Sequence, residues 1–570
     1  MTRGAAILIR MALTYWLSAA GGKAWIVTLF LIACTVLIVL LNMQINNWQV
    51  GFYSHLQRHS LSGFYDALVQ FVLLSAITAG TSGWQTHFRL LLQIRWRQWL
   101  TNKYITLWLN NQTYFRMNFI ANAVDNPDQR ISEDINLFVT HSLDLATGLL
   151  RHIVTLIVFS SVLWQLSGEL HFSLFDTSVV LHGYLVLSAL FYSALGTWLT
   201  MGVGRPLMFQ NNIQQSNEAD FRYSLVRLKE HGESVALYKG DKQEKVNLLL
   251  RFATIVTTYL SIIRTTRAIT WLTSAYSQFS IVFAFLIAVP RYFNEELQLG
   301  QLFEISGAYW YVHSALSYII ESFGKIAQWQ AVTDRLNEFY NQLIKTDSYS
   351  KKKPVPQAFC KHNALIIKNL SIFTPGGHIL LNKLTLEIYA GNSLLITGPS
   401  GCGKTTILRT LSGLWPYFDG LISFPQNHAM LFLPQKPYLP VGSLRSAILY
   451  PHMLDTSDAV LNECLTLCQL SECVPHLDIQ ADWSKVLSLG ELQRLSLVRA
   501  ILHQPEWLFL DETTSCIDSQ MEQVMYQVLK EKLPASTIIS IGHRDTLKAY
   551  HRQIVELNGT GIWHSTHSNL

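Results

Sequence analysis

The chain has 570 residues, more than one compact core usually holds, because domains typically run to about 250 residues at most. Charged residues make up only 14% of it, against about 25% in an average soluble domain, and aromatic residues reach 12%. A net charge of +5 is too small for this length to suggest a nucleic-acid partner, so the composition favours a chain that lies largely in lipid.

The N-terminal part contains apolar stretches of about 20 residues, the length that crosses about 30 Å of hydrocarbon as a helix. Three of them lack Asp, Glu, Lys and Arg: Ala24–Met43, Ser178–Gly204 and Ala268–Val289. The other three carry one or two charged residues: Phe64–Phe88, Leu145–Leu166 and Leu302–Phe323. Because unpaired backbone groups are costly in lipid, we predict a membrane α-helical bundle of six spans over residues 1–345.

Basic residues flank the first two spans, with Arg3, Arg10 and Lys23 before the first and Arg89, Arg95, Arg97 and Lys103 after the second. The positive-inside rule places these flanks in the cytoplasm, and an even number of spans returns the C-terminus there. The long connections Arg89–Asp144 and Arg205–Arg267 are then cytoplasmic as well. Since Arg3 and Arg10 interrupt the first short apolar run, we expect no cleavable signal peptide.

The pattern changes after the last span. Residues 346–357 are polar and include two prolines and the run Lys351–Lys353, which predicts an exposed linker. The lysine run is either a solvated charge run or a contact with anionic membrane lipid. A second domain is expected over residues 358–570.

Three cysteines of this second domain, Cys464, Cys468 and Cys473, lie close together in a leucine-rich stretch. Their spacing provides no fourth ligand nearby for a metal site, and a free cysteine behaves as a small hydrophobe. We therefore expect buried residues of a helical segment.

A phosphate-binding loop follows the strand-like segment Ser393–Thr397. The sequence GPSGCGKT fits the pattern GxxxxGK followed by Ser or Thr, and a helix-like segment comes next. Glycines let the backbone curl so that its N–H groups point at phosphate oxygens. Lys404 is expected to hold the β and γ phosphates, and Thr405 to bind Mg²⁺. The expected nucleotide contacts are Gly398, Pro399, Ser400, Gly401, Cys402, Gly403, Lys404, Thr405 and Thr406.

An acidic pair, Asp511 and Glu512, ends the buried-strand run Trp507–Leu510. After a phosphate-binding loop in the same domain, this arrangement predicts that Asp511 binds Mg²⁺ and that Glu512 orients an attacking water as general base.

Between these motifs, the sequence LSLGELQR at residues 487–494 resembles the signature LSGGQxxR of the ABC ATPase family, with departures at Leu489 and Glu491. Gln435 resembles the Q-loop glutamine, Ser515–Asp518 the D-loop, and His543 the switch histidine. The resemblance implies an α/β P-loop ATPase domain that uses ATP and Mg²⁺. It also implies a magnesium contact by Gln435 and a catalytic contact of His543 with the γ phosphate.

In this family two ATPase domains enclose two ATP molecules, each between one phosphate loop and the partner's signature. The resemblance therefore implies that Ser488, Gly490 and Glu491 bind nucleotide from the opposite copy, so the partner is a second copy of this chain. An aromatic residue usually stacks on adenine upstream of the phosphate loop. Thr374 occupies the expected position here, with Phe373 beside it as a substitute.

The segment Asp482–Glu491 is similar to the signature region of bacterial half-transporters of the SbmA/BacA kind, which are themselves similar to peroxisomal subfamily D transporters. Asn126–Ile131, Glu218–Tyr223 and Glu233–Gly240 resemble loop motifs of the same group, and we expect these loops to dock on the ATPase domain. The resemblance implies a multi-pass protein of the bacterial inner membrane with the ATPase domain in the cytoplasm.

The same resemblance implies uptake of a bulky solute such as a peptide, an antibiotic or a cobalamin-like compound. An exporter, an acyl-CoA or lipid transporter, and an ATP-gated channel or sensor are the alternatives. Glu304, His313 and Glu321 lie on or beside the sixth predicted span. They either line a water-filled cavity or, for the two glutamates, lie at the membrane interfaces.

Overall fold

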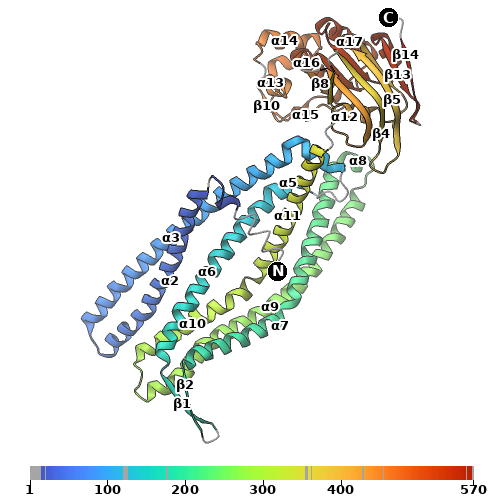
Figure 1. The fold of residues 1–570 in the computed structure, drawn as a ribbon. Helices are drawn as coiled ribbons and strands as arrows, with labels where there is room; N and C mark the ends of the chain where they lie inside the picture. The colour runs from blue at the N-terminus through green and yellow to red at the C-terminus, as the bar shows by residue number, and fades with distance from the viewer. Residues whose placement is uncertain are drawn as a thin grey trace. The chain divides into compact units, whose positions relative to one another are not determined.

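The computed structural model describes residues 14–19, 21–119, 126–174, 177–352, 357–360, 363–425, 429–452, 455–559 and 561–567 (Figure 1). Arg3 and Arg10 and residues 353–356 of the predicted linker lie outside them. The chain divides into two compact units. The first takes the residues up to Thr106 and Val124–Tyr340, and the second takes Leu107–Ala123 and Asn341–Leu570.

Long helices build the first unit: α2 (Gly21–Gln57), α3 (Leu61–Leu109), α6 (Ile135–Ser167), α7 (Tyr184–Glu230), α9 (Asp241–Phe293), α10 (Leu299–Glu321) and the start of α11 (Phe323–Lys352). Among the described residues, five helices are long and apolar enough to cross a membrane, namely α2, α3, α6, α7 and α9. Helix α10 covers the sixth predicted span and, at about 1.5 Å per residue, its 23 residues reach about 35 Å. It is not among the five, and its sequence contains Glu304 and His313 together with several Ser, Tyr and Trp residues, which lower its mean hydropathy.

Two predicted boundaries differ from the structure. Residues 178–182 were expected in the fourth span but lie in strand β2 (Thr177–His182), which pairs with β1 (Glu169–Leu174) in an antiparallel hairpin. The stretch is free of charge, but Gly183 has a φ of +72° and separates the strand from α7. The first half of the predicted linker is also helical, because α11 continues to Lys352 and its sequence contains no proline.

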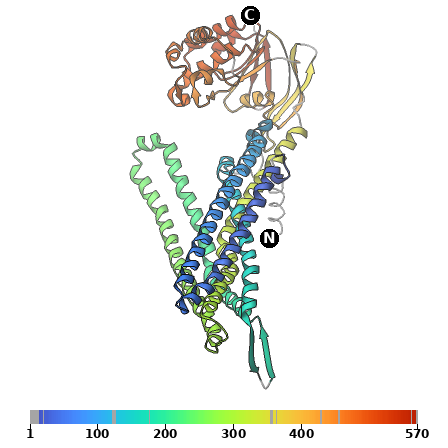
Figure 2. The same ribbon diagram turned by 90° about the vertical axis from the view of Figure 1, so that its left-hand side faces the viewer.

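Helices α7 and α9 run side by side along most of their length (Figure 1 and Figure 2). At one end, α7 and α9 pack with α6 and α10 around buried residues that include Phe159, Leu185, Ala288 and Tyr309. Toward the turn that joins them through α8 (Gly232–Leu237), the pair diverges from the other helices (Figure 2). Its side chains there are largely exposed.

Among the described residues, two larger sheets and the short antiparallel pair of β9 (Gly442–Ser443) and β10 (Gln480–Ala481) build the second unit. The larger sheet has the strand order β14-β13-β6-β12-β11-β8. Its strands are β6 (Ser393–Thr397), β8 (Met430–Leu433), β11 (Trp507–Asp511), β12 (Thr537–Ile541), β13 (Gln553–Leu557) and β14 (Trp563–His567). All neighbouring pairs are parallel except β13 with β14. Every residue of β11 and β12 is buried, as expected for central parallel strands with both faces covered.

The second sheet has the order β3-β7-β4-β5, formed by β3 (Gln357–Cys360), β4 (Ala364–Phe373), β5 (Ile379–Tyr389) and β7 (Phe418–Pro425). It packs with the larger sheet and with α12 (Lys404–Leu411) around a shared apolar core that includes Ile367, Ile396, Phe424 and Phe509.

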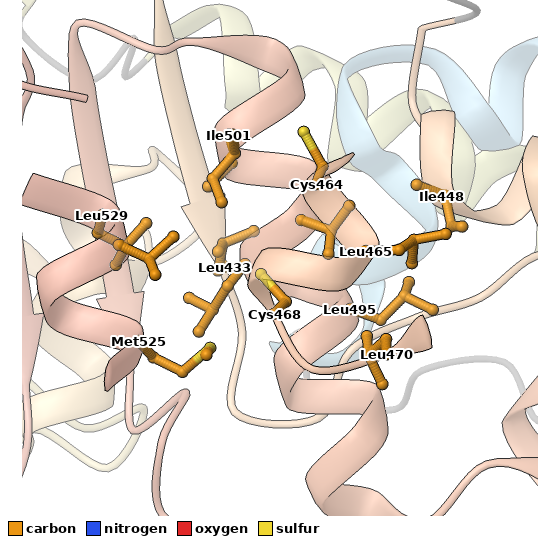
Figure 3. Packing of buried hydrophobic residues seen from close by; sticks show 14 of the residues in the cluster. Leu433, Ile448, Cys464, Leu465, Cys468, Leu470, Leu495, Ile501, Met525 and Leu529 are labelled. Carbon is orange, nitrogen blue, oxygen red and sulfur yellow. The ribbon is translucent and has the colours of Figure 1, made fainter. Parts of the chain in front are cut away.

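A helical layer contains α13 (Leu444–Leu449), α14 (Asp458–Leu467), α16 (Leu489–His503) and α17 (Ser519–Lys532). Their buried faces share a second core with residues of β8, β11 and β12. Figure 3 shows Cys464 and Cys468 among the leucines of this cluster, and Cys473 is buried in it as well. The prediction that these cysteines are buried in a helical segment is confirmed.

We expect Leu529→Ala in α17 to destabilise the second unit by about 2–5 kcal/mol, because Leu529 is fully buried and the truncation leaves a cavity. Thermal unfolding of the full-length protein in detergent measures the effect. Val524→Ala on the exposed side of the same helix is the matched control and should have little effect. Equal effects of the two substitutions would contradict the assigned core.

Candidate active site

The predicted catalytic residues lie at one edge of the larger sheet. The strands β6, β12, β11 and β8 are parallel neighbours, so their carboxyl ends lie together. The phosphate loop follows β6, His543 follows β12, and Glu512 follows β11. Gln435 comes two residues after β8. The topology thus brings together motifs that are up to 145 residues apart in the chain.

The phosphate loop, residues 398–403, requires its glycines. Gly398, Gly401 and Gly403 have φ angles of +147°, +82° and +97°. A Cβ atom at position 398 would also lie 2.5 Å from the carbonyl oxygen of Leu557. The Lys404 ammonium donates to the carbonyl oxygens of Gly398 and Pro399, at 2.8 and 3.0 Å, so the loop curls around its own lysine.

Remaining members of the predicted set also fall in this loop and the first turn of α12. Pro399, Ser400 and Gly401 are exposed, Cys402 is buried, and Thr406 is half-buried. Gly403 is the N-cap of α12, so the partial positive charge of this helix end lies at the loop.

Asp511 ends β11 and is largely buried. Its Oδ1 accepts a hydrogen bond of 3.1 Å from the Thr405 hydroxyl. Burial raises the pKa of the Asp511 carboxyl, and the bond from Thr405 opposes that shift. A carboxylate and a hydroxyl in contact supply the hard oxygen ligands that Mg²⁺ prefers, so the residues present fit this ion.

Glu512 has a φ of +47°, in the left-handed region that residues with a side chain rarely adopt. Such a conformation costs about 1–3 kcal/mol and persists only where the surroundings impose it. Its N–H donates to the carbonyl oxygen of Ile541 at 3.1 Å, and its carboxylate accepts a 3.0 Å bond from the Gln435 amide. The Glu512 side chain is thereby directed toward the Q-loop residue.

The signature residues lie at the start of α16. Ser488 is the N-cap, and it forms a capping box with Glu491. The Glu491 carboxylate accepts bonds from the Ser488 N–H at 2.8 Å and from its hydroxyl at 2.7 Å. These bonds hold the pKa of Glu491 below its usual range. Glu491, which stands where the family signature has Gln, therefore keeps the helix cap and places a negative charge at the N-terminus of α16.

Within the described part of the chain, two of the predicted site residues, His543 and Phe373, form no hydrogen bond or ring contact with the other site residues. His543 is exposed at the end of β12. Phe373 is the last residue of β4, and the side chain of Thr374 accepts a bond from the His378 N–H within the following turn. The expected stacking of adenine on Phe373 stays a prediction.

A segment of the first long connection belongs to the same compact unit as the ATPase domain. The Phe119 ring packs edge-on against Trp415 with ring centroids 4.9 Å apart, and its carbonyl oxygen accepts a 2.7 Å bond from the Tyr417 hydroxyl. Phe115 lines a cavity of about 500 Å³ together with Thr405, Gln435, Asp511 and neighbouring residues.

No role was predicted for Phe115 or Phe119. Docking on the ATPase domain was expected of Asn126–Ile131, Glu218–Tyr223 and Glu233–Gly240, and that expectation stays a prediction. The first of these motifs leads into Asp134, which is 2% exposed inside the first unit. Asp134 accepts a bond from Arg130 at 2.9 Å and two from Arg335 at 2.7 and 3.0 Å. The signal in the sequence was the spacing of Phe115 and Phe119, two aromatic residues four positions apart in a connection that is predicted to be cytoplasmic.

The predicted cavity residues are placed differently. Glu304 and His313 are buried between helices, where Asn46 donates to the Glu304 carbonyl oxygen at 3.0 Å. Nδ1 of His313 lies 3.4 Å from the hydroxyl oxygens of both Ser193 and Tyr276. Glu321 is exposed at the end of α10. None of the three lines the polar cavity of about 340 Å³ in this unit, whose charged lining residues are Arg89, Asp144, Arg151 and Lys325.

His551 is fully buried beside β12, where it contacts Ser540. Its two ring nitrogens each lie 2.8 Å from an oxygen, the Leu547 carbonyl and the Ser540 hydroxyl. Burial lowers the pKa of His551 from 6.5 to about 4.

We therefore expect the folded domain to lose stability as the pH falls from about 6.5 to about 4, since only the unfolded chain takes up this proton there. The His551→Gln variant should show a shallower dependence of melting temperature on pH in that window. His564→Gln, at an exposed site, is the control and should keep the original dependence. An unchanged slope in His551→Gln would contradict the prediction.

Comparison with known proteins supports the membrane and ATPase halves separately. Residues 13–293 match the family "ABC transporter transmembrane region 2", and residues 381–515 match the family "ABC transporter". An ABC transporter ATP-binding protein of Haemophilus influenzae is 35% identical over 96% of this chain and 93% of its own length. The inner membrane ABC transporter ATP-binding protein YddA of Escherichia coli is 31% identical, with 93% of each chain covered.

The human lysosomal cobalamin transporter ABCD4 is 28% identical over 93% of this chain and 91% of its own length. A solved structure of a bacterial Atm1-family ABC exporter with ATP bound has a TM-score of 0.73 and covers 94% of this chain and 95% of its own, at 16% identity. That similarity concerns the fold alone, which is the predicted membrane bundle joined to an ABC ATPase domain. The similarity to ABCD4 agrees with the predicted relation to subfamily D, whereas the SbmA/BacA assignment stays a prediction.

With both halves matched and relatives of more than 30% identity along nearly the whole chain, this protein belongs to the ABC transporters and is a multi-pass membrane protein that couples ATP hydrolysis to transport.

Proposed function

We propose that two copies of this chain form a transporter in a bacterial inner membrane, with the ATPase domains in the cytoplasm, and that it takes up a bulky hydrophilic solute. The observation that carries the proposal is the sheet edge at which the phosphate loop, Asp511, Glu512 and Gln435 meet. In a chain that also has several membrane helices, ATP hydrolysis at this edge would supply the free energy for a conformational cycle of those helices.

In this proposal the phosphate loop binds the triphosphate through its backbone N–H groups, and Lys404 neutralises the β and γ phosphates. Glu512 accepts a proton from the attacking water, and His543 contacts the γ phosphate from the adjacent strand end. Thr405, Gln435 and Asp511 would hold Mg²⁺, which neutralises charge on the phosphates. The oxygen contact between Thr405 and Asp511 supports this assignment.

A second copy completes each site by supplying Ser488, Gly490 and Glu491 at the start of its α16. The dimer is also supported by exposed apolar side chains in the predicted cytoplasmic part of α7 and α9. Exposed apolar residues there include Phe209, Tyr223, Leu249, Leu250, Phe252 and Tyr259. Lipid cannot cover them outside the membrane, whereas a partner chain of the same kind would.

Coupling is proposed to pass through Phe115 and Phe119. Phe119 is fixed to the ATPase domain by Trp415 and Tyr417, and Phe115 reaches the cavity lined by Gln435. A change at the Q-loop during the ATP cycle would therefore move the chain segment that continues into α3.

The proposed solute and the proposed direction of transport are based on what related proteins are named for. ABCD4 is named as a cobalamin transporter and YddA as an inner membrane protein, whereas the Atm1-family structure is titled an exporter. The polar cavity lined by Arg89, Arg151 and Lys325 is a suitable place for contact with a hydrophilic solute. Uptake of labelled cobalamin and of a peptide antibiotic into right-side-out and inside-out vesicles tests both points. ATP-dependent accumulation of neither solute, or accumulation with the opposite orientation, would contradict the proposal.

We expect Glu512→Gln to bind ATP but to hydrolyse it at least tenfold more slowly, because removing a positioned base typically costs about 10²–10⁴-fold. Steady-state ATPase assays and nucleotide binding on the purified protein measure the two properties. Glu531→Gln, an exposed carboxylate on α17, is the control and should retain full turnover. Near wild-type turnover in Glu512→Gln would remove it from the proposed role.

We expect Phe119→Ala to uncouple the protein: ATP hydrolysis continues, but ATP-dependent solute accumulation falls by about tenfold or more, because the aromatic contact with Trp415 is lost. ATPase activity and vesicle transport are measured on the same preparation. Phe293→Ala, an exposed residue at the end of α9, is the control. A parallel loss of hydrolysis and transport in Phe119→Ala would argue against a coupling role.

A further inference from the structure

Gln493 lies in the second turn of α16 and is fully buried, at 0% exposure. A buried amide needs partners for its oxygen and for both of its N–H groups. Neither the phosphate loop nor the helix cap at Ser488 uses this side chain. Its partners lie instead in three other motifs of the ATPase domain.

The Gln493 oxygen accepts a 2.9 Å bond from the N–H of Cys516 in the D-loop. Its nitrogen lies 3.2 Å from the hydroxyl of Ser515 and 3.4 Å from the carbonyl oxygens of Gln435 and Glu512. The orientation of the amide is fixed, because a backbone N–H only donates and a carbonyl only accepts. One side chain thus joins the signature helix to the D-loop, the Q-loop and the general-base residue.

The contact with Glu512 concerns a residue whose backbone is held in the left-handed region. The carbonyl oxygen of Glu512 also accepts a 3.0 Å bond from the Ser515 N–H. Gln493 adds a bond to the same oxygen from a separate helix, so it helps to impose the backbone conformation from which the Glu512 carboxylate projects.

The D-loop is fixed from its other side as well. Arg544, next to His543, donates to the carbonyl oxygens of Ile517 and Ser515 at 2.8 and 3.1 Å. The start of α16 approaches the same loop so closely that a Cβ on Gly490 would lie 3.2 Å from the carbonyl oxygen of Cys516. The D-loop therefore lies between α16 and the loop that carries His543.

We infer that Gln493 is a positioning residue for ATP hydrolysis. It holds the backbones of Glu512 and Gln435 in a fixed position relative to the D-loop. In this way it links the signature end of α16 to the general base of its own domain. This inference rests on the proposed role of Glu512. A purely structural role of Gln493 in the core is the competing explanation, and the two differ in what a substitution changes.

The test uses the full-length dimer in lipid nanodiscs and the variant Gln493→Met, which keeps the length of the side chain but removes every hydrogen bond. We expect kcat for ATP to fall by about tenfold or more, since small misplacements of catalytic groups cost up to about 10²-fold. KM for ATP should stay within about twofold, because the phosphate loop is untouched. Ser496→Ala is the control, since Ser496 is buried one turn along α16 and its hydroxyl donates to the Gln493 carbonyl oxygen within the same helix.

Gln493→Glu is measured in parallel, so that the test does not depend on the folding of one variant. It keeps the shape and an oxygen facing Cys516. The two N–H donors that face Ser515, Gln435 and Glu512 are replaced by a single O–H when the carboxyl is protonated and by none when it is ionised. The same loss of kcat is expected. Size-exclusion chromatography verifies the dimer for each variant before the kinetics are compared.

The double variant Gln493→Met with Glu512→Gln separates positioning from general damage. If Gln493 acts through Glu512, the double variant is no slower than Glu512→Gln alone. The inference is overturned if Gln493→Met turns over like Ser496→Ala, or if the two losses multiply. If Glu512→Gln itself retains full turnover, the proposed general base has failed, and that outcome is distinct from a failure of the inference on Gln493.

Discussion

The parallel order of four neighbouring strands is the constraint on which the active site depends. Because β6, β12, β11 and β8 all run in one direction, the segment that follows each strand emerges at the same edge of the sheet. Burial on both faces keeps β11 and β12 in register, and that register sets where Asp511 and His543 lie. Stability of the core and placement of the proposed catalytic groups therefore depend on the same sheet.

Hydrogen bonds then convert this shared edge into a defined site. Thr405 contacts Asp511, Gln435 contacts Glu512, and the buried Gln493 connects the latter pair to the D-loop. Each of these bonds joins residues from different segments of the ATPase domain, so a displacement of one segment affects the others. Such a network suits an ATPase that must convert nucleotide binding into movement of helices.

The motifs could be recognised in the sequence, because a phosphate loop or a signature is a local pattern whose glycines and charged residues have a direct physical reason. The roles of their residues stay predictions. The sequence also predicted the burial of Cys464 and Cys468 from their leucine-rich surroundings. It did not predict Gln493, since a buried amide is defined by partners that are distant in the chain. The contact of Phe119 with Trp415 was not predicted for the same reason, and neither was the pairing of Asp134 with Arg335, which lies 201 residues away in the chain. The strand at residues 177–182 escaped prediction because residues 178–204 lack Asp, Glu, Lys and Arg, and such a stretch resembles a membrane span whether it is helical or extended.

The central claim is that each ATP site is shared between two copies, and a mixed dimer tests it most directly. One protomer carries Lys404→Ala and the other carries Ser488→Arg, so a shared arrangement places both defects in one site and leaves the other site intact. Vanadate trapping of labelled nucleotide on the purified mixed dimer should then exceed the level of either homodimeric variant. Trapping at background level, with the mixed dimer folded and intact, would contradict the account.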